Sequence, residues 1–138
     1  MELKPFHTGI PEVIAEINRL ASKGIPFLFI IDFEMDKSLI FALSDIDPGI
    51  LLYDMEGITN QPAFVRVNKQ PVLVKHPEPF VTYLSRFNSV INEIHFGNSY
   101  LLNLTCATPI ELNLTPEEIF HIARARFRIY LKDEFVCF

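Results

Sequence analysis

The fold class is decided by the stretch PFVTYLSRFNSVINEIHFGNSYLLNLTCA, residues 79–107, in which the spacing of apolar residues changes halfway. Residues 80–96 carry apolar side chains three and four positions apart, as in an amphipathic helix, and Gly97 is placed to end that helix. Residues 99–107 then alternate, which predicts a strand. The apolar positions of that strand are Tyr100, Leu102, Leu104 and Cys106. A helix that leads directly into a strand predicts a domain of mixed α and β structure.

Regular elements are also predicted on both sides of this stretch. Residues 71–75 are a short apolar run next to prolines, which predicts a strand. Downstream, Thr115-Pro-Glu-Glu118 combines a capping threonine, a proline at the first helical position and a capping-box glutamate. It predicts a helix that ends near Ala125. Residues 126–131 and 134–138 predict a hairpin or two successive strands.

The N-terminal part predicts one more helix and three strands. Thr8 is placed to cap a helix, and Pro11 and Glu12 are residue types that favour its first turn. Gly24 is placed to end this helix. Three apolar runs predict strands, because each is too short for a helix and is bounded by turn residues. These runs are 27–33, which we expect to be buried on both faces, 39–43 and 50–53. The chain therefore predicts an α+β fold with a mostly antiparallel sheet, about three helices and about seven strands.

The composition of the 138 residues is that of an acidic globular domain. Lys and Arg number 12 and Asp and Glu number 17, a formal net charge of −5, which argues against a general nucleic-acid binder. The longest apolar run, 27–31, is far shorter than the ~20 residues of a membrane span. No signal-peptide pattern opens the chain, so we expect a cytoplasmic protein with reduced cysteines.

The residues alone indicate no reaction. Asp32, Glu34 and Asp36 alternate, but the glycine and distal glutamate of a calcium loop are missing, so a strand end turning into solvent is favoured. The four histidines lack the spacing of a zinc site, and no glycine-rich phosphate loop is present. Cys106 and Cys137 are expected to be buried apolar residues rather than nucleophiles. We therefore predict no metal site and no nucleotide site.

Three arginines alternate across the junction between the predicted third helix and the strand that follows it: Arg124, Arg126 and Arg128. Guanidinium groups recognise carboxylates through paired hydrogen bonds, so one hypothesis is that these residues bind a ligand that carries a carboxylate. The alternative is that they are solvated or form ion pairs within the chain. The expected partners are then Glu117, Glu118 or Asp133.

Residues 97–105, Gly-Asn-Ser-Tyr-Leu-Leu-Asn-Leu-Thr, resemble the glycine–acid–x–aromatic–Gln–Val–Asn–Leu–Ser segment of chorismate-utilising enzymes. These are the synthase components of anthranilate, aminodeoxychorismate and isochorismate formation. Asn103-Leu104 is most similar to the para-aminobenzoate branch, in which the enzyme is aminodeoxychorismate synthase component I. The resemblance covers residues 80–138, whereas residues 1–79 agree with the family only in general layout.

The chain also departs from the family pattern. Leu101 stands where isochorismate-type members have a lysine base, and leucine transfers no proton, so an isochorismate mechanism loses support. Asn98 replaces the usual acid. Residues 123–127 differ from the segment that helps to form a tryptophan pocket in feedback-regulated members, so that pocket is not carried over.

The resemblance implies that residues 1–138 are the N-terminal portion of a chorismate-binding enzyme, truncated before the family's Ser-Pro-Glu motif and without an internal domain boundary. The complete enzyme would be a transferase of folate biosynthesis, an α/β sandwich that aminates chorismate with Mg²⁺ and with ammonia from a glutamine amidotransferase subunit. The family's catalytic residues and magnesium ligands lie beyond residue 138. We therefore expect no catalytic residue and no bound metal in this chain, which would be inactive alone.

Within the chain, the resemblance implies that Tyr100, Asn103 and Thr105 border the chorismate site, with Asn103 as a hydrogen-bonding residue. The alternatives are a fragment of anthranilate synthase component I or a freestanding, non-enzymatic binding or regulatory module. We expect neither nucleic acid nor a membrane as a partner. Unpaired strand edges predict self-association. The sequence fixes neither the product branch nor the oligomeric state.

Overall fold

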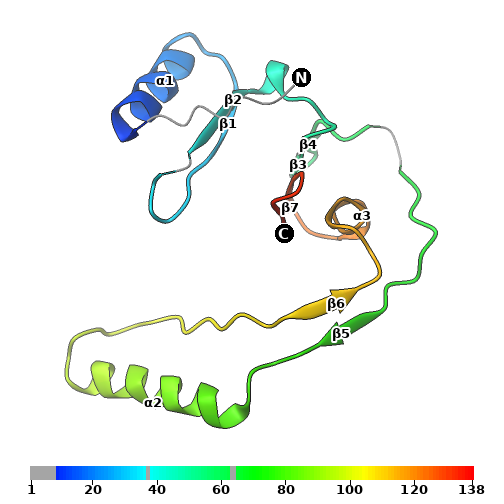
Figure 1. Cartoon of the computed structure of the whole chain (residues 1–138). Helices are drawn as coiled ribbons and strands as arrows, with labels where there is room; N and C mark the ends of the chain where they lie inside the picture. The colour runs from blue at the N-terminus through cyan, green and yellow to red at the C-terminus, as the bar shows by residue number, and fades with distance from the viewer. Residues whose placement is uncertain (1–8, 37, 63–64) are drawn as a thin grey trace. The chain divides into compact units, whose positions relative to one another are not determined.

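The computed structural model describes residues 9–36, 38–62 and 65–138, which form two compact units (Figure 1). The first unit holds the described residues before 68 together with 116–138, and the second unit holds 68–115. Two compact units can belong to one domain. The expectation of a single N-terminal portion without an internal boundary therefore stays a prediction.

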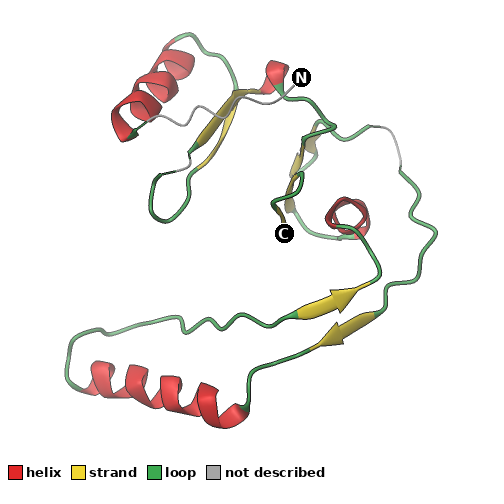
Figure 2. Ribbon diagram, in the orientation of Figure 1, coloured by secondary structure: helices red, strands yellow, loops and turns green. Residues whose placement is uncertain are grey.

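The first unit contains two α-helices, a short 3-10 helix and six strands (Figure 2). In chain order they are α1 (Ile10–Ser22), β1 (Phe27–Ile30), β2 (Leu39–Ala42), the 3-10 helix (Leu43–Asp45), β3 (Leu51–Met55), β4 (Ile58–Thr59), α3 (Pro116–Ile122), β7 (Phe127–Leu131) and β8 (Phe135–Cys137). Strands β1 and β2 form one sheet, and a second sheet has the order β4-β3-β7-β8. All of these pairings are antiparallel.

The second unit contains α2 (Phe80–His95) between β5 (Leu73–Lys75) and β6 (Ile110–Leu112), which pair antiparallel. His76 and Glu111 extend this pairing with a side-chain contact of 2.8 Å. Across the described residues, three α-helices accompany strands that pair antiparallel throughout. The predicted α+β fold class is therefore confirmed.

The core of the first unit lies between layers. In β2, Ile40 packs against α1, while Phe41 faces the opposite way and joins a cluster with Leu51 of β3. The other face of β3 presents Leu52 to Phe120 of α3, and Phe120 is fully buried. Alternate residues of a strand point to opposite faces, so both β2 and β3 are covered on two sides. The layers are helix, two-stranded sheet, four-stranded sheet and helix.

Helix α1 ends as the sequence predicted. Gly24 has a φ of 64° and donates its N–H to the carbonyl of Ala21 at 3.0 Å. The next residue, Ile25, donates to the carbonyl of Leu20 at 3.0 Å, which completes a Schellman motif. At the other end of the helix, Gly9 is the N-cap residue, and the predicted cap Thr8 lies outside the described residues.

The prediction that residues 27–33 are a strand buried on both faces is wrong. Strand β1 ends at Ile30, Phe29 is 52% exposed and Phe33 is 95% exposed. The chain leaves the sheet in a turn closed by the N–H of Met35 and the carbonyl of Asp32 at 3.1 Å. An apolar run shows that burial is favourable, but the extent of a strand is set by its partner, here the four residues of β2.

The strand predicted over residues 99–107 is also not formed. Alternation assigns side chains to faces, but a strand needs a hydrogen-bonded neighbour, and no described segment pairs with residues 99–107. Strand β4, for which the sequence made no prediction, forms because Glu56 and Gly57 have φ values of 53° and 93° and make a two-residue hairpin turn.

Within residues 9–36, 38–62 and 65–138, no helix combines the length and the hydropathy that crossing a membrane requires.

Candidate functional site

The three residues expected to border a substrate site lie in the second unit, on the connection between α2 and β6. Tyr100 is 93% exposed, and Asn103 and Thr105 are exposed as well. The connection is held near α2 by Asn98, whose side chain donates to Glu93 at 2.6 Å, and by Cys106, whose sulfur accepts from Arg86 at 3.6 Å. The pockets described below lie in the first unit and contain none of the three.

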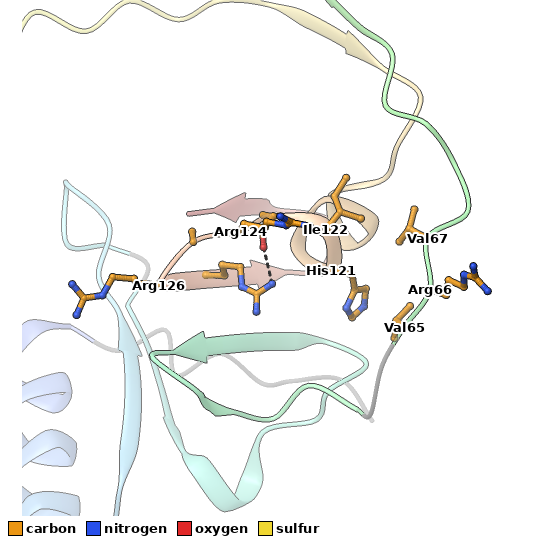
Figure 3. A pocket seen from close by; sticks show the side chains of 10 residues that line it. Val65, Arg66, Val67, His121, Ile122, Arg124 and Arg126 are labelled. Atoms are coloured by element: carbon orange, nitrogen blue, oxygen red, sulfur yellow. Dashed lines mark hydrogen bonds between the residues drawn. The ribbon is translucent and has the colours of Figure 1, made fainter.

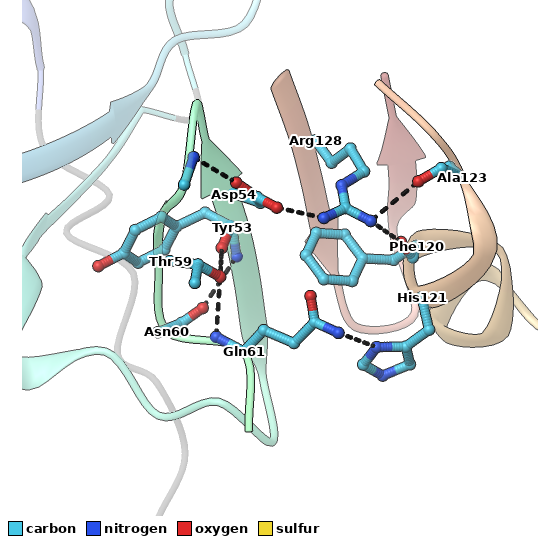
Figure 4. Close-up of polar contacts among 10 residues, drawn as sticks. Tyr53, Asp54, Thr59, Asn60, Gln61, Phe120, His121, Ala123 and Arg128 are labelled. Atoms are coloured by element: carbon cyan, nitrogen blue, oxygen red, sulfur yellow. Dashed lines mark hydrogen bonds and ion pairs between the residues drawn. The ribbon is translucent and has the colours of Figure 1, made fainter. Parts of the chain in front are cut away.

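A more enclosed group of polar side chains lies in the first unit, around an ion pair between Asp54 of β3 and Arg128 of β7 (Figure 4). The pairing of these strands sets the two residues directly opposite each other. Their side chains are only 17% and 13% exposed. The hydrogen bond from Arg128, followed by a bond from the N–H of Gly57, lowers the pKa of the Asp54 carboxyl. The pair is therefore charged at neutral pH.

Arg128 also closes the C-terminal end of α3. Its Nη1 donates to the carbonyls of Phe120 at 3.0 Å and Ala123 at 2.9 Å. The last carbonyls of a helix lack hydrogen-bond donors within the helix and carry partial negative charge. A guanidinium supplies both the donors and the positive charge. The guanidinium carbon lies 5.1 Å from the centre of the Phe120 ring. Among the described residues, Nε of Arg128 is buried without a hydrogen-bond partner.

The side chains of Thr59 and Asn60, at the end of β4 and just after it, hydrogen-bond to backbone groups of β3 and of the following residue (Figure 4). Asn60 donates to the carbonyl of Leu51 at 2.7 Å and accepts from the N–H of Tyr53 at 2.9 Å. Thr59 donates to the carbonyl of Tyr53 at 2.6 Å and accepts from the N–H of Gln61 at 3.0 Å. These bonds orient Gln61 toward α3.

Gln61 meets His121 of α3, with 3.1 Å between the amide Nε2 and the imidazole Nδ1. The amide donates, so Nδ1 is the acceptor and the ring proton is assigned to Nε2, 3.9 Å from a carboxylate oxygen of Glu117. The His121 side chain is 3% exposed. The pKa of His121 is lowered, and burial is the largest cause. The charge of Glu117 raises this pKa, and the charge of Arg128 lowers it further. The imidazole is therefore neutral at pH 7.

An open pocket of about 710 Å³ lies between the segment 65–67 and the chain from the end of α3 to β7 (Figure 3). Four arginines and one histidine are among its ten lining residues, and no lining residue is acidic. The lining residues are Val65, Arg66, Val67, His121, Ile122, Ala123, Arg124, Ala125, Arg126 and Arg128. A second pocket, of about 310 Å³, is lined mainly by apolar side chains of β1, β3 and β4. The basic pocket is the candidate functional site.

The three alternating arginines that the sequence singled out differ in their ion-pair partners. Arg128 pairs with Asp54 and Arg126 pairs with Glu56, and both carboxylates belong to the β3–β4 hairpin. Arg124 is exposed and has no ion-pair partner among the residues that the structure describes. The sequence suggested nearby carboxylates because it does not reveal which strand lies next to β7. The alternation of the arginines was the signal in the sequence that pointed to this site. The sequence did not show the β3–β7 register, which sets the carboxylates opposite two of them.

The predicted absence of metal and nucleophile chemistry stays a prediction. In the part of the chain that the structure describes, no group of three or more His, Cys, Asp or Glu side chains is placed to hold a metal ion. Asp32, Glu34 and Asp36 lie in the turn after β1. Both cysteines are free: Cys106 is partly buried and Cys137 is exposed. Neither sulfur has a histidine partner among the described contacts.

Comparison with known proteins connects the chain to longer relatives. It is 39% identical over 128 residues to an uncharacterised PabA-like protein of Haemophilus influenzae. That alignment covers 91% of this chain and 38% of the Haemophilus protein. It is 34% identical over 126 residues to an uncharacterised PabA-like protein of Pasteurella multocida. That alignment covers 91% of this chain and 39% of the Pasteurella protein. The chain thus spans less than two fifths of the length of either relative. No protein-family model and no solved structure matches it.

Proposed function

We propose that the chain is the N-terminal portion of the chorismate-aminating component of para-aminobenzoate synthesis, aminodeoxychorismate synthase component I, and that it is inactive alone. The observation that carries the proposal is the segment 97–105, which resembles the chorismate-utilising enzymes. The PabA-like name of a relative that is 39% identical over 91% of the chain supports a place on the para-aminobenzoate pathway. That the chain spans 38% of this relative is compatible with an activity that needs further residues.

The name PabA itself denotes the glutamine amidotransferase component, which gives a second candidate function. An amidotransferase hydrolyses glutamine with an activated nucleophile, and a cysteine is activated by an adjacent base. The described partner of the Cys106 sulfur is Arg86, not a histidine. Component I remains the proposal because segment 97–105 resembles the chorismate-utilising enzymes.

In the proposed enzyme, Tyr100, Asn103 and Thr105 contact chorismate. Their exposure leaves the Asn103 amide and the hydroxyls of the other two available to a substrate. An amide offers both donors and an acceptor, which suits the hydroxyl and carboxylate groups of chorismate. Magnesium would act as a Lewis acid in the complete enzyme, and no group of three metal-ligating side chains among the described residues would hold it. No catalytic step is assigned to this chain.

The coding DNA beyond codon 138 is the first test. A reading frame that continues into a Ser-Pro-Glu motif supports the proposal. A stop codon directly after Phe138 contradicts it and favours the freestanding binding module.

The second test is an assay of the complete protein with chorismate, Mg²⁺ and ammonium, with the products separated by chromatography. We expect aminodeoxychorismate from the complete protein and no product from residues 1–138. Anthranilate as the product would overturn the choice of branch, and glutamine hydrolysis without chorismate turnover would favour the amidotransferase. Asn103→Ala should lower kcat/KM about tenfold, the loss expected for one hydrogen bond to a charged group. The same substitution at Asn88, an exposed residue of α2, is the matched control.

A further inference from the structure

The basic pocket concentrates positive charge in a chain whose net charge is −5. Four of the six arginines of the sequence line it, and the lining includes no aspartate or glutamate. These arginines are Arg66, Arg124, Arg126 and Arg128. Arginines repel one another, so gathering them in one place is unfavourable unless anions balance them. The question is which of the four charges the chain itself balances.

Two of the four are matched inside the first unit. Glu56 pairs with Arg126, and Asp54 pairs with Arg128. Arg66 and Arg124 are exposed, and neither has an ion-pair partner among the residues that the structure describes. His121 lines the same pocket as a neutral imidazole, because burial lowers its pKa. Two positive charges therefore remain unmatched in the lining.

We propose that this pocket binds a small ligand that carries two negative charges on oxygen, a phosphate or a dicarboxylate, and that Arg66 and Arg124 supply the ion pairs. The volume of about 710 Å³ falls in the range of small-molecule sites. Val65, Val67 and Ile122 give the lining an apolar part that accommodates a short carbon skeleton. Guanidinium groups bind carboxylate and phosphate through the same paired geometry.

Figure 3 shows the side chain of Arg66 turned outward, so binding includes a change of its rotamer. Because Arg66 is exposed, staggered alternatives are open to it without repacking the core. Arg128 and Arg126 keep their carboxylate partners and serve as the fixed part of the wall. The site thus combines two arginines that are paired with carboxylates of the chain, Arg126 and Arg128, and two exposed arginines, Arg66 and Arg124.

The test is titration of the chain with inorganic phosphate, succinate and acetate, followed by calorimetry and by the NMR signals of the histidine rings. We expect saturable binding of phosphate or succinate, at least tenfold tighter than acetate, with the ring signals of His121 shifting and those of His95, on α2, unchanged. Preference for phosphate or for succinate decides which of the two the pocket takes. Arg66→Gln and Arg124→Gln should each weaken binding about tenfold.

The matched control is Arg19→Gln, which removes an exposed arginine of α1 that pairs with Glu16 and lies outside the pocket. It should leave the affinity unchanged. The proposal is overturned if neither dianion binds at millimolar concentration, if both pocket variants bind as tightly as the parent chain, or if Arg19→Gln weakens binding equally. Far-UV circular dichroism checks that each variant is folded. The proposed chorismate activity plays no part in this experiment, so either proposal can fail alone.

Discussion

Replacing Asp54 with asparagine tests whether the ion pair between β3 and β7 holds the first unit together. The substitution keeps the shape of the side chain and can keep the bond from the N–H of Gly57, which donates to an amide oxygen as it does to a carboxylate oxygen. It removes the negative charge opposite Arg128 and sets an amide N–H against the guanidinium donors. A cation that is mostly buried then loses its counter-charge.

The expected loss follows from the burial of the pair. Breaking a fully buried ion pair by removing one partner costs about 3–5 kcal/mol. Here the side chains remain 13% and 17% exposed, and Arg128 keeps the carbonyls of Phe120 and Ala123 as acceptors. We therefore expect a loss of about 2 kcal/mol in the free energy of unfolding. The control is Glu56→Gln, which breaks a pair whose side chains are 79% and 49% exposed and should cost less than about 1 kcal/mol.

Urea unfolding followed by circular dichroism measures both variants. Because the pKa of Asp54 is lowered in the folded chain, its contribution is complete above the unfolded value of about 3.9 and is lost as pH falls through the folded value. The parent chain should therefore lose more stability on acidification than Asp54→Asn. The reasoning is refuted if Asp54→Asn destabilises no more than Glu56→Gln, or if the two chains respond equally to acid.

Three further predictions use the same unfolding assay. The lowered pKa of His121 means that the unfolded chain binds a proton more readily, so stability should fall as pH drops below about 6.5. In His121→Asn this dependence should weaken, and an unchanged slope would exclude His121 as its source. Gly24→Ala places a Cβ at a φ of 64° and should cost about 1 kcal/mol; no loss would show that α1 ends differently in solution. Phe120→Ala empties a fully buried position and should cost about 3–5 kcal/mol, and a loss below about 1 kcal/mol would mean that α3 is not packed on the sheet.

The proposed site shows where prediction from sequence ended. The alternation of Arg124, Arg126 and Arg128 was visible, and a carboxylate-bearing ligand was one of two hypotheses for it. The structure assigns two of these arginines to carboxylates of the β3–β4 hairpin, leaves Arg124 exposed, and adds Arg66, which sequence reasoning had not selected. His121 was visible only as one of four scattered histidines. Its hydrogen-bond partner is Gln61, which lies 60 residues away in the chain.

What the sequence by itself determined is local. The amphipathic period of residues 80–95, the glycine that ends α1, the proline and glutamates that open α3 and the β7–β8 hairpin all rest on interactions between residues a few positions apart. What only the tertiary structure decided is pairing. Asp54 and Arg128 are 74 residues apart, and the extended segment after α2 lacks a partner strand among the described residues. Local propensity fixes φ and ψ over a few residues. The neighbour of a strand, and with it the lining of a pocket, is fixed by burial across the whole unit, which no short window of sequence contains.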